Sequence, residues 1–245
     1  MLRTFAERLS RNVVLRRRLP RDLGGQLIYV TPESALNFWY PGLERADTGH
    51  LMDAVKRFVA PEWVAWDVGA NVGLFSFAAA FKARTVLALE PDPWLASLLS
   101  RSASAIPKVT VLCVAVTDKV GVGELNVSER GRATTFMTGF GSSQTGGVRN
   151  RQHVMTVTLD WLAQRFPIPD IIKIDVEGGE RLVLEGGSAL ISRTRPHIVC
   201  EVASANSSWA TEFLLSLGYS FLDEHLNPTP FAIDNIVAVP SHPSR

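Results

Sequence analysis

The stretch Trp63 to Gly73, WVAWDVGANVG, decides the fold of this 245-residue chain. Its first half, Trp63 to Val68, is apolar apart from Asp67, as expected for a strand buried on both faces of a parallel sheet. The glycine-rich turn that follows leads straight into a helical pattern. Gly69 removes the side chain where a ligand must approach the backbone, Gly73 lets the helix pack close to the sheet, and the helix start offers free N–H donors. The stretch therefore predicts a strand that ends in a ligand-binding turn.

The pattern of a short apolar run followed by a helical stretch repeats along the chain. Further buried strands are predicted at Thr85–Leu89, Val109–Val114, Ile171–Ile174 and His197–Val202. Helices are predicted at Gly73–Phe81, Pro93–Ser104, Leu159–Phe166, Glu180–Ile191 and Ser207–Leu217. A final strand pair is expected at Tyr219–Leu222 and Ile233–Val239, an extra strand at Gly121–Ser128, and a Gly-, Ser- and Thr-rich loop at Gly131–Gly147. This alternation predicts an α/β fold with a Rossmann-like, doubly wound, mostly parallel sheet.

The chain begins with a basic arm. Its first 25 residues hold seven arginines against two carboxylates, Glu7 and Asp22. Apolar residues recur at helical spacing from Leu2 to Val13, so the arm is expected to be an amphipathic helix. Such a helix would either pack on the domain or make peripheral contact with an anionic membrane.

An N-terminal extension, residues 1–46, is predicted to precede the main domain, residues 47–245. After the arm, Gln26–Val30 and Ala35–Tyr40 predict a hairpin around a Thr-Pro-Glu-Ser turn. The main domain opens with a helix that Asp47 or Thr48 can cap and that ends before Pro61.

Composition excludes several classes of protein. With 46% apolar and 20% charged residues, the chain has the make-up of an ordinary globular protein. Two cysteines, Cys113 and Cys200, cannot form a disulfide framework or a cysteine zinc site. The longest uncharged apolar stretch, Val68 to Phe81, is shorter than the roughly 18 residues that a membrane-spanning helix needs. No secretory signal is visible, so a soluble, cytoplasmic protein is expected.

Two acidic residues mark the predicted ligand-binding edge. Asp67 precedes the glycine turn, where a carboxylate suits a ligand with an ammonium group better than a diphosphate. Glu90 follows the next strand, and an acid at that point can accept both hydroxyls of a ribose. The alternative for Glu90 is a carboxylate that caps a helix.

A third acidic position lies at the end of the strand Ile171–Ile174, in the stretch IIKIDVEG. Asp175 ends this strand where ligands bind in open α/β sheets, and Glu177 follows two residues later. Lys173 and Asp175 share one face by the two-residue strand period, so an ion pair that only supports the sheet is the alternative.

These motifs, together with ALEP at Ala88–Pro91, AVTD at Ala115–Asp118, TLD at Thr158–Asp160 and IKIDVEGGE at Ile172–Glu180, resemble the FkbM family of S-adenosylmethionine-dependent methyltransferases in order and spacing. The resemblance covers roughly residues 47–222. It implies a class I methyltransferase fold of seven strands, the last one antiparallel. It also implies methyl transfer to a hydroxyl of a sugar or secondary metabolite.

The resemblance also implies a set of cofactor-binding residues. The turn on the methionine side of the cofactor would be Asp67, Gly69, Ala70, Asn71 and Gly73. Glu90 would bind the ribose, and Ala115 and Asp118 would lie beside the adenine. The family often has Ala where Gly179 stands, and its sequences vary most around the Gly131–Gly147 loop, so the acceptor site cannot be carried over.

The candidate catalytic residues are Asp175 and Glu177. Methyl transfer to a hydroxyl needs alignment and removal of the hydroxyl proton, and Asp175 could bind or deprotonate the acceptor. Oxygen ligands from Asp175 with Glu177 or Glu201 would suit Mg²⁺, but no spacing motif supports a metal and no metal ligand is assigned. His153 and His197 are further potential bases.

Three other functions stay open. An NAD-type oxidoreductase is disfavoured by the missing G-x-G-x-x-G spacing and by Asp67. A non-catalytic nucleoside-binding or interaction module is disfavoured by the intact turn and Glu90. A nucleic-acid methyltransferase would need a phosphate track, whereas the chain carries a net charge of only +1 and its excess of positive charge lies in the arm. The expected partner is therefore a small-molecule or glycan hydroxyl acceptor.

Overall fold

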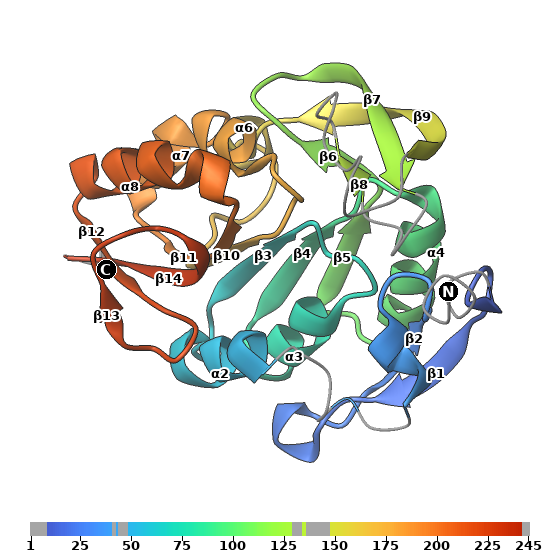
Figure 1. Ribbon diagram of the computed structural model, residues 1–245. Coiled ribbons are helices and arrows are strands. Elements are labelled where there is room, and N and C mark those ends of the chain that lie inside the picture. Colours follow the sequence, from blue (N-terminus) through green and yellow to red (C-terminus); the bar gives the residue numbers. More distant parts are fainter. Residues whose placement is uncertain (1–8, 41–42, 44–48, 129–133, 136–147, 242–245) are drawn as a thin grey trace.

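The computed structural model in Figure 1 describes residues 9–40, 43, 49–128, 134–135 and 148–241. Within these residues an eight-stranded sheet forms the centre of the molecule. Its strand order is β13 (Pro228–Thr229), β12 (Tyr219–Leu222), β14 (Asp234–Pro240), β11 (His197–Val202), β10 (Ile171–Ile174), β3 (Val64–Val68), β4 (Thr85–Leu89) and β5 (Val109–Leu112).

The directions of these strands are those of a doubly wound sheet. β11, β10, β3, β4 and β5 pair in parallel, so their carboxyl ends meet at one edge. β14 runs antiparallel to both β11 and β12. The predicted Rossmann-like α/β fold is confirmed.

Helices cover both faces of the sheet (Figure 1). One layer holds α2 (Gly49–Phe58), α3 (Leu74–Lys82) and α4 (Pro93–Ala103), and the other holds α5 (Leu159–Leu162), α6 (Glu180–Glu185), α7 (Ser188–Thr194), η4 (Ser204–Asn206) and α8 (Ser207–Ser216). Ala65 of β3 joins the apolar core of the first layer, while Trp66 and Val68 join that of the second. Both faces of β3 are therefore buried, which explains its unbroken apolar sequence.

A small second sheet is inserted between β5 and β10. Its order is β6 (Ala115–Val116), β9 (Val148–Val157), β7 (Gly121–Ser128) and β8 (Thr134–Thr135). β7 coincides with the predicted extra strand, whereas β9 was not predicted. Apart from β8, the Gly131–Gly147 loop lies outside the described residues.

The N-terminal prediction is wrong in two respects. The hairpin joins β1 (Leu15–Arg18) to β2 (Leu27–Val30), across the 3-10 turn η1 (Arg21–Leu23). Leu36–Trp39, expected as the second strand, is the 3-10 turn η2. β1 begins two residues after Val13, the last apolar residue of the predicted basic helix, and its partner β2 buries Ile28 and Val30 in the first core. Residues 1–8 of the arm lie outside the described residues.

The predicted helix Glu180–Ile191 is two helices, α6 and α7, separated by Gly186 and Gly187. A Cβ at Gly186 would collide with the carbonyl oxygen of Thr117, so the chain needs glycine to pass there. The carboxylate of Asp160 accepts hydrogen bonds from the backbone N–H groups of Ala189 and Leu190 (3.2 and 2.7 Å), which starts α7 afresh. Among the described residues, no helix is long and apolar enough to cross a bilayer.

Candidate active site

The turn after β3 holds three neighbouring strands together. Gly69, Asn71 and Gly73 all have positive φ, at 72°, 52° and 91°. The N–H groups of Gly69 and Ala70 both donate to the carbonyl of Leu89 on β4 (2.9 and 3.0 Å). A Cβ at Gly69 would collide with the backbone carbonyl oxygen of Asp175, so glycine lets the end of β10 approach the turn.

Glu90 lies at the end of β4 and is only 3% exposed. Its Oε2 accepts a hydrogen bond from the backbone N–H of Asn71 (2.7 Å), and its Oε1 accepts one from that of Asp92 (2.8 Å). Burial raises the pKa of Glu90 to about 7, against the opposing effect of these two hydrogen bonds. The glycine turn therefore fixes the carboxylate, and each oxygen keeps a lone pair for a ligand.

Lys173 connects two of the predicted acidic positions. Its buried ammonium lies 3.2 Å from Oδ1 of Asp67 and 3.3 Å from Oδ2 of Asp175, and it donates to the carbonyl of Gly69 (2.6 Å). Burial alone would lower the pKa of Lys173. The negative charges of Asp175 and Asp67 have the larger effect, so the pKa is raised. Oδ2 of Asp67 accepts a hydrogen bond from the Ser76 hydroxyl (2.6 Å). The lysine thus ties the turn after β3 to the end of β10.

The loop after β10 presents further carboxyl groups. The side chain of Asp175 is 35% exposed, and Glu177 and Glu201 stand exposed beside it. Partial desolvation, and then the negative charge of Asp175, raise the pKa of Glu177 and of Glu201 to about 7. Below them, buried Glu180 accepts a hydrogen bond from the N–H of Gly178 (2.6 Å) and shapes the loop.

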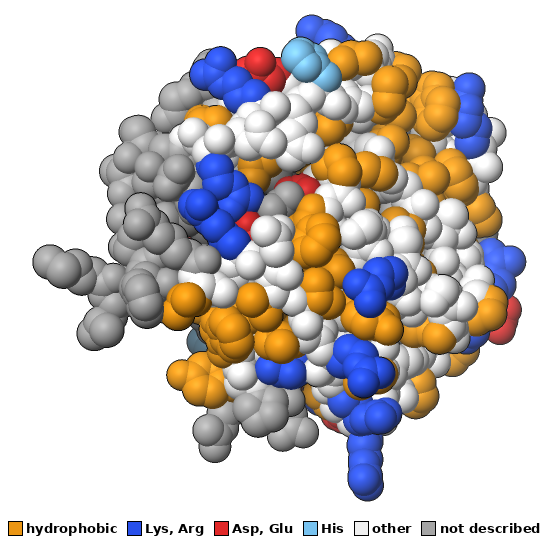
Figure 2. Space-filling view, turned by 90° about the vertical axis from the view of Figure 1, so that its right-hand side faces the viewer, with side chains coloured by type: hydrophobic (Ala, Val, Ile, Leu, Met, Phe, Trp, Pro, Cys, Tyr) orange, Lys and Arg blue, Asp and Glu red, His pale blue; other side chains and the backbone are white. Residues whose placement is uncertain are grey.

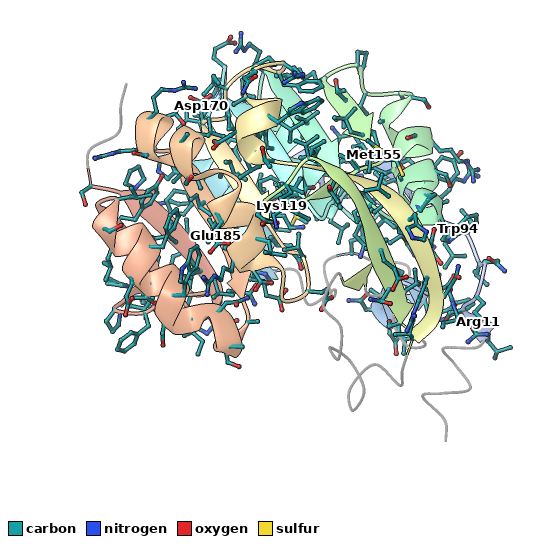
Figure 3. The ribbon with its side chains drawn as sticks, turned by 90° about the horizontal axis from the view of Figure 1, so that it is seen from above. Arg11, Trp94, Lys119, Met155, Asp170 and Glu185 are labelled. Carbon is teal, nitrogen blue, oxygen red and sulfur yellow. The ribbon has the colours of Figure 1, made fainter. Side chains whose placement is uncertain are left out.

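These groups border a cleft with an empty volume of about 750 Å³. Gly69, Asn71, Glu90, Ala115, Asp175 and Glu177 line it, so the structure brings six of the predicted site residues together. Its apolar wall is formed by Leu89, Leu95, Val114, Val116, Leu125 and Leu182. Seen from above (Figure 3), Lys119, in the loop before β7, lies between Glu185 of α6 and Met155 of β9.

Four predicted cofactor-binding residues do not line the cleft. Asp67 is fully buried and paired with Lys173 and Ser76. Ala70 is buried, and Gly73 packs against Phe77 and Leu99. Asp118 points to Lys119, 3.6 Å away. Of the other bases considered, His197 packs against the rings of Phe58 and Trp63.

Sequence reasoning missed several residues that build the site. Thr117 and Leu125 line the cleft from the inserted sheet. Asn206 donates to Oε2 of Glu180 (2.7 Å) and to the carbonyl of Gly178 (2.9 Å), which holds the loop after β10. Only the start of a helix at Asn206 hinted at this contact, because its partners lie more than 20 positions away.

The donor set suits a nucleoside-containing cofactor better than a metal. Among the described residues, no three His, Cys, Asp or Glu side chains are arranged to hold a metal ion. In contrast, buried Glu90 has free lone pairs and lines a cleft with an apolar wall, which fits a ribose beside a base.

The sheet order and the glycine turn at its carboxyl edge define the class I methyltransferase fold. The family profile of the methyltransferase FkbM domain matches residues 67–223, and the chain belongs to that family. Membership of this family implies S-adenosylmethionine as the cofactor. A search of curated proteins finds no match to this chain.

Solved structures of similar fold include several methyltransferases. Methyltransferase FkbM from Methylobacillus flagellatus is 18% identical with a TM-score of 0.48, over 72% of this chain and 43% of that one, so this chain spans less than half of its length. The ribosomal protein L11 methylase from Lactobacillus delbrueckii is 13% identical with a TM-score of 0.48, over 82% of each chain. Trm5b from Pyrococcus abyssi is 14% identical with a TM-score of 0.47, over 88% of this chain and 52% of that one.

Proposed function

We propose that this protein transfers a methyl group from S-adenosylmethionine to a hydroxyl group of a sugar or secondary metabolite. The observation that carries the proposal is the shared cleft: the carboxylate of Glu90 and the turn at Gly69 and Asn71 line one part of it, and Asp175 and Glu177 line another. A cofactor group and an acceptor group can therefore meet in one cleft.

The cofactor would be held by the first part of the cleft. Glu90 would accept the two ribose hydroxyls, and Ala115 with the apolar wall would contact the adenine. We assign Asp67 to a positioning role through Lys173, in place of direct contact with the ammonium group, because its carboxylate is fully buried and already paired. Bound there, the cofactor would supply an electrophilic methyl group on a sulfonium.

The acceptor would be handled by Asp175 and Glu177. During methyl transfer, one of these two carboxylates would accept the proton that the acceptor hydroxyl loses. Lys173 orients the Asp175 carboxylate at 3.3 Å. A pKa of about 7 makes Glu177 a group that changes protonation near neutral pH, where a general base works best.

Asp175→Asn tests the proposal, since it keeps the shape and removes the charge. S-adenosylmethionine affinity, measured by calorimetry, should stay within about twofold, while turnover falls by a factor of about 10² to 10⁴. Turnover is followed as release of S-adenosylhomocysteine across a panel of sugars and secondary metabolites, with transfer RNA as a competing acceptor. Methylation of the RNA alone, or a parallel loss of cofactor binding and activity, would overturn the assignment.

A further inference from the structure

The outer face of the β1–β2 hairpin carries arginines and apolar side chains together. In this antiparallel pair Arg18 stands opposite Leu27, and Arg16 opposite Tyr29, so all four side chains share one face. Arg16, Arg18 and Leu27 are exposed. The guanidinium of Arg101, from α4, lies 4.1 Å above the ring of Tyr29 and adds a third positive charge to this face.

A second group of exposed apolar side chains lies where Arg17, which points away from the face of Arg16 and Arg18 by the two-residue strand period, meets the chain after η2. Leu9, Trp39 and Tyr40 are 58%, 43% and 61% exposed. The guanidinium of Arg17 donates to the backbone carbonyls of Trp39 and Tyr40 (3.1 and 2.8 Å), and the Trp39 indole N–H donates to the hydroxyl of Ser10 (3.0 Å). The backbone at Trp39 and Tyr40 and the indole ring of Trp39 are therefore fixed beside the hairpin. We call this set of residues the N-terminal surface: Leu9, Arg16, Arg18, Leu27, Tyr29, Trp39, Tyr40 and Arg101.

The charge of this surface is not neutralised within the described residues. No carboxylate among them lies within ion-pair distance of Arg16, Arg18 or Arg101. The nearby carboxylates are taken: Asp22 pairs with Lys56 (2.6 Å) and buried Glu33 with Arg149 (2.6 Å). Figure 2 looks onto this side of the molecule, and in its lower part Lys and Arg side chains stand beside hydrophobic ones, with few acidic ones.

We propose that the N-terminal surface docks this protein onto an anionic lipid bilayer. Exposed Trp and Tyr rings flanked by arginines match the region between lipid headgroups and acyl chains, where rings partition and cations meet phosphate. The phosphates of a nucleic acid could pair with the arginines, but they would leave the apolar side chains of Leu9 and Leu27 exposed to solvent. None of these residues is among those that line the cleft, so the docked protein keeps its cleft accessible. The proposal is independent of the proposed methyl transfer.

Flotation with vesicles tests the proposal on the full chain. Vesicles of phosphatidylcholine with one third phosphatidylglycerol should bind the protein, pure phosphatidylcholine vesicles should bind it far more weakly, and added salt should weaken binding. Arg16→Glu with Arg18→Glu should lower the partition coefficient by tenfold or more. The matched control, Arg165→Glu with Arg193→Glu, changes two exposed arginines on the α5–α7 layer and should leave the partition coefficient unchanged.

The apolar contribution is tested separately. Leu27→Ser should lower binding to anionic vesicles severalfold without altering its salt dependence. Leu215→Ser, on α8, should not change binding, although Leu215 is 50% exposed against 42% for Leu27. Folding of each variant is checked by circular dichroism and by S-adenosylhomocysteine binding. Absence of vesicle binding at low salt, equal losses in the control variants, or tight binding of RNA combined with no effect of Leu27→Ser would each overturn the proposal.

Discussion

At the residue scale, Glu90 is the group whose charge should set cofactor affinity. Its pKa of about 7 means that protonation competes with the acceptance of ribose hydroxyls as the pH falls. The dissociation constant of adenosine should therefore rise, approaching tenfold per pH unit, below about pH 7. Titration calorimetry between about pH 5.5 and about pH 8 measures this, because adenosine itself does not ionise in that range.

The control for this prediction is 2′,3′-dideoxyadenosine, which lacks both hydroxyls and should bind weakly with no pH dependence. Glu90→Gln should likewise flatten the pH profile of adenosine binding. A pH-independent adenosine affinity in the parent protein would show that Glu90 does not bind the ribose.

Lys173 is the residue on which the buried carboxylate of Asp67 depends. Lys173→Met would leave that carboxylate uncompensated in the core, and removing one partner of a buried pair costs roughly 3 to 5 kcal/mol of unfolding free energy. Urea denaturation should register this loss. The double variant Lys173→Met with Asp67→Asn should recover much of it; if the double variant is as unstable as the two single losses added together, the two side chains are not coupled.

At the scale of elements, the break between α6 and α7 is predicted to matter for the cleft. In Gly186→Ala the new methyl group would press on the carbonyl of Thr117, a residue that lines the cleft. We expect a loss of roughly 1 to 3 kcal/mol in unfolding free energy and weaker binding of S-adenosylhomocysteine. Thermal denaturation and calorimetry measure both effects.

Gly121→Ala is the matched control for Gly186→Ala. A Cβ at Gly121 would meet its nearest neighbour, the hydroxyl of Thr156, only at 3.8 Å, so this change should alter stability by no more than about 0.5 kcal/mol. Equal losses in the two variants would mean that the close approach of Gly186 to Thr117 is not the cause.

Elements with a strong local pattern could be predicted from the sequence. β4, β7, β10, β11 and β12 have their predicted bounds, because burial on both faces or strict alternation leaves a clear pattern. β9 could not be predicted, since its charged first half, with Arg149 and Arg151, lies on a largely exposed face. The hairpin was misassigned because β1, Leu15–Arg18, lacks the apolar alternation of a strand and forms through its pairing with β2, whose Ile28 and Val30 are buried.

Part of the candidate site could likewise be predicted from the sequence, and part could not. The glycine turn and Glu90 are neighbours across two consecutive strands, so their meeting follows from local pattern and from the general rule for strand ends. The link of Lys173 to Asp67 depends on β10 lying next to β3, which the order of strands along the chain does not specify. The burial of Asp67 also depends on this strand order. Because its carboxylate is buried, we assign Asp67 to support of the turn and not to ligand contact.

At the scale of the whole molecule, the glycine turn after β3 is completed from two distant parts of the chain. The carbonyl of Gly69 receives the ammonium of Lys173 from 104 positions away, and β10 must lie between β3 and β11 for this to happen. Closing so long a loop costs entropy before the contact forms. We expect the glycine turn to reach its final form only when β10 has been inserted between β3 and β11.

Ligand binding then favours molecules in which the central sheet is complete. A cofactor that binds only the completed turn stabilises the folded protein by an amount that grows with the logarithm of the cofactor concentration. Partly folded copies do not bind it. Proteases act on the copies that remain open. If the cofactor binds there, added S-adenosylmethionine should raise the resistance of this protein to proteolysis.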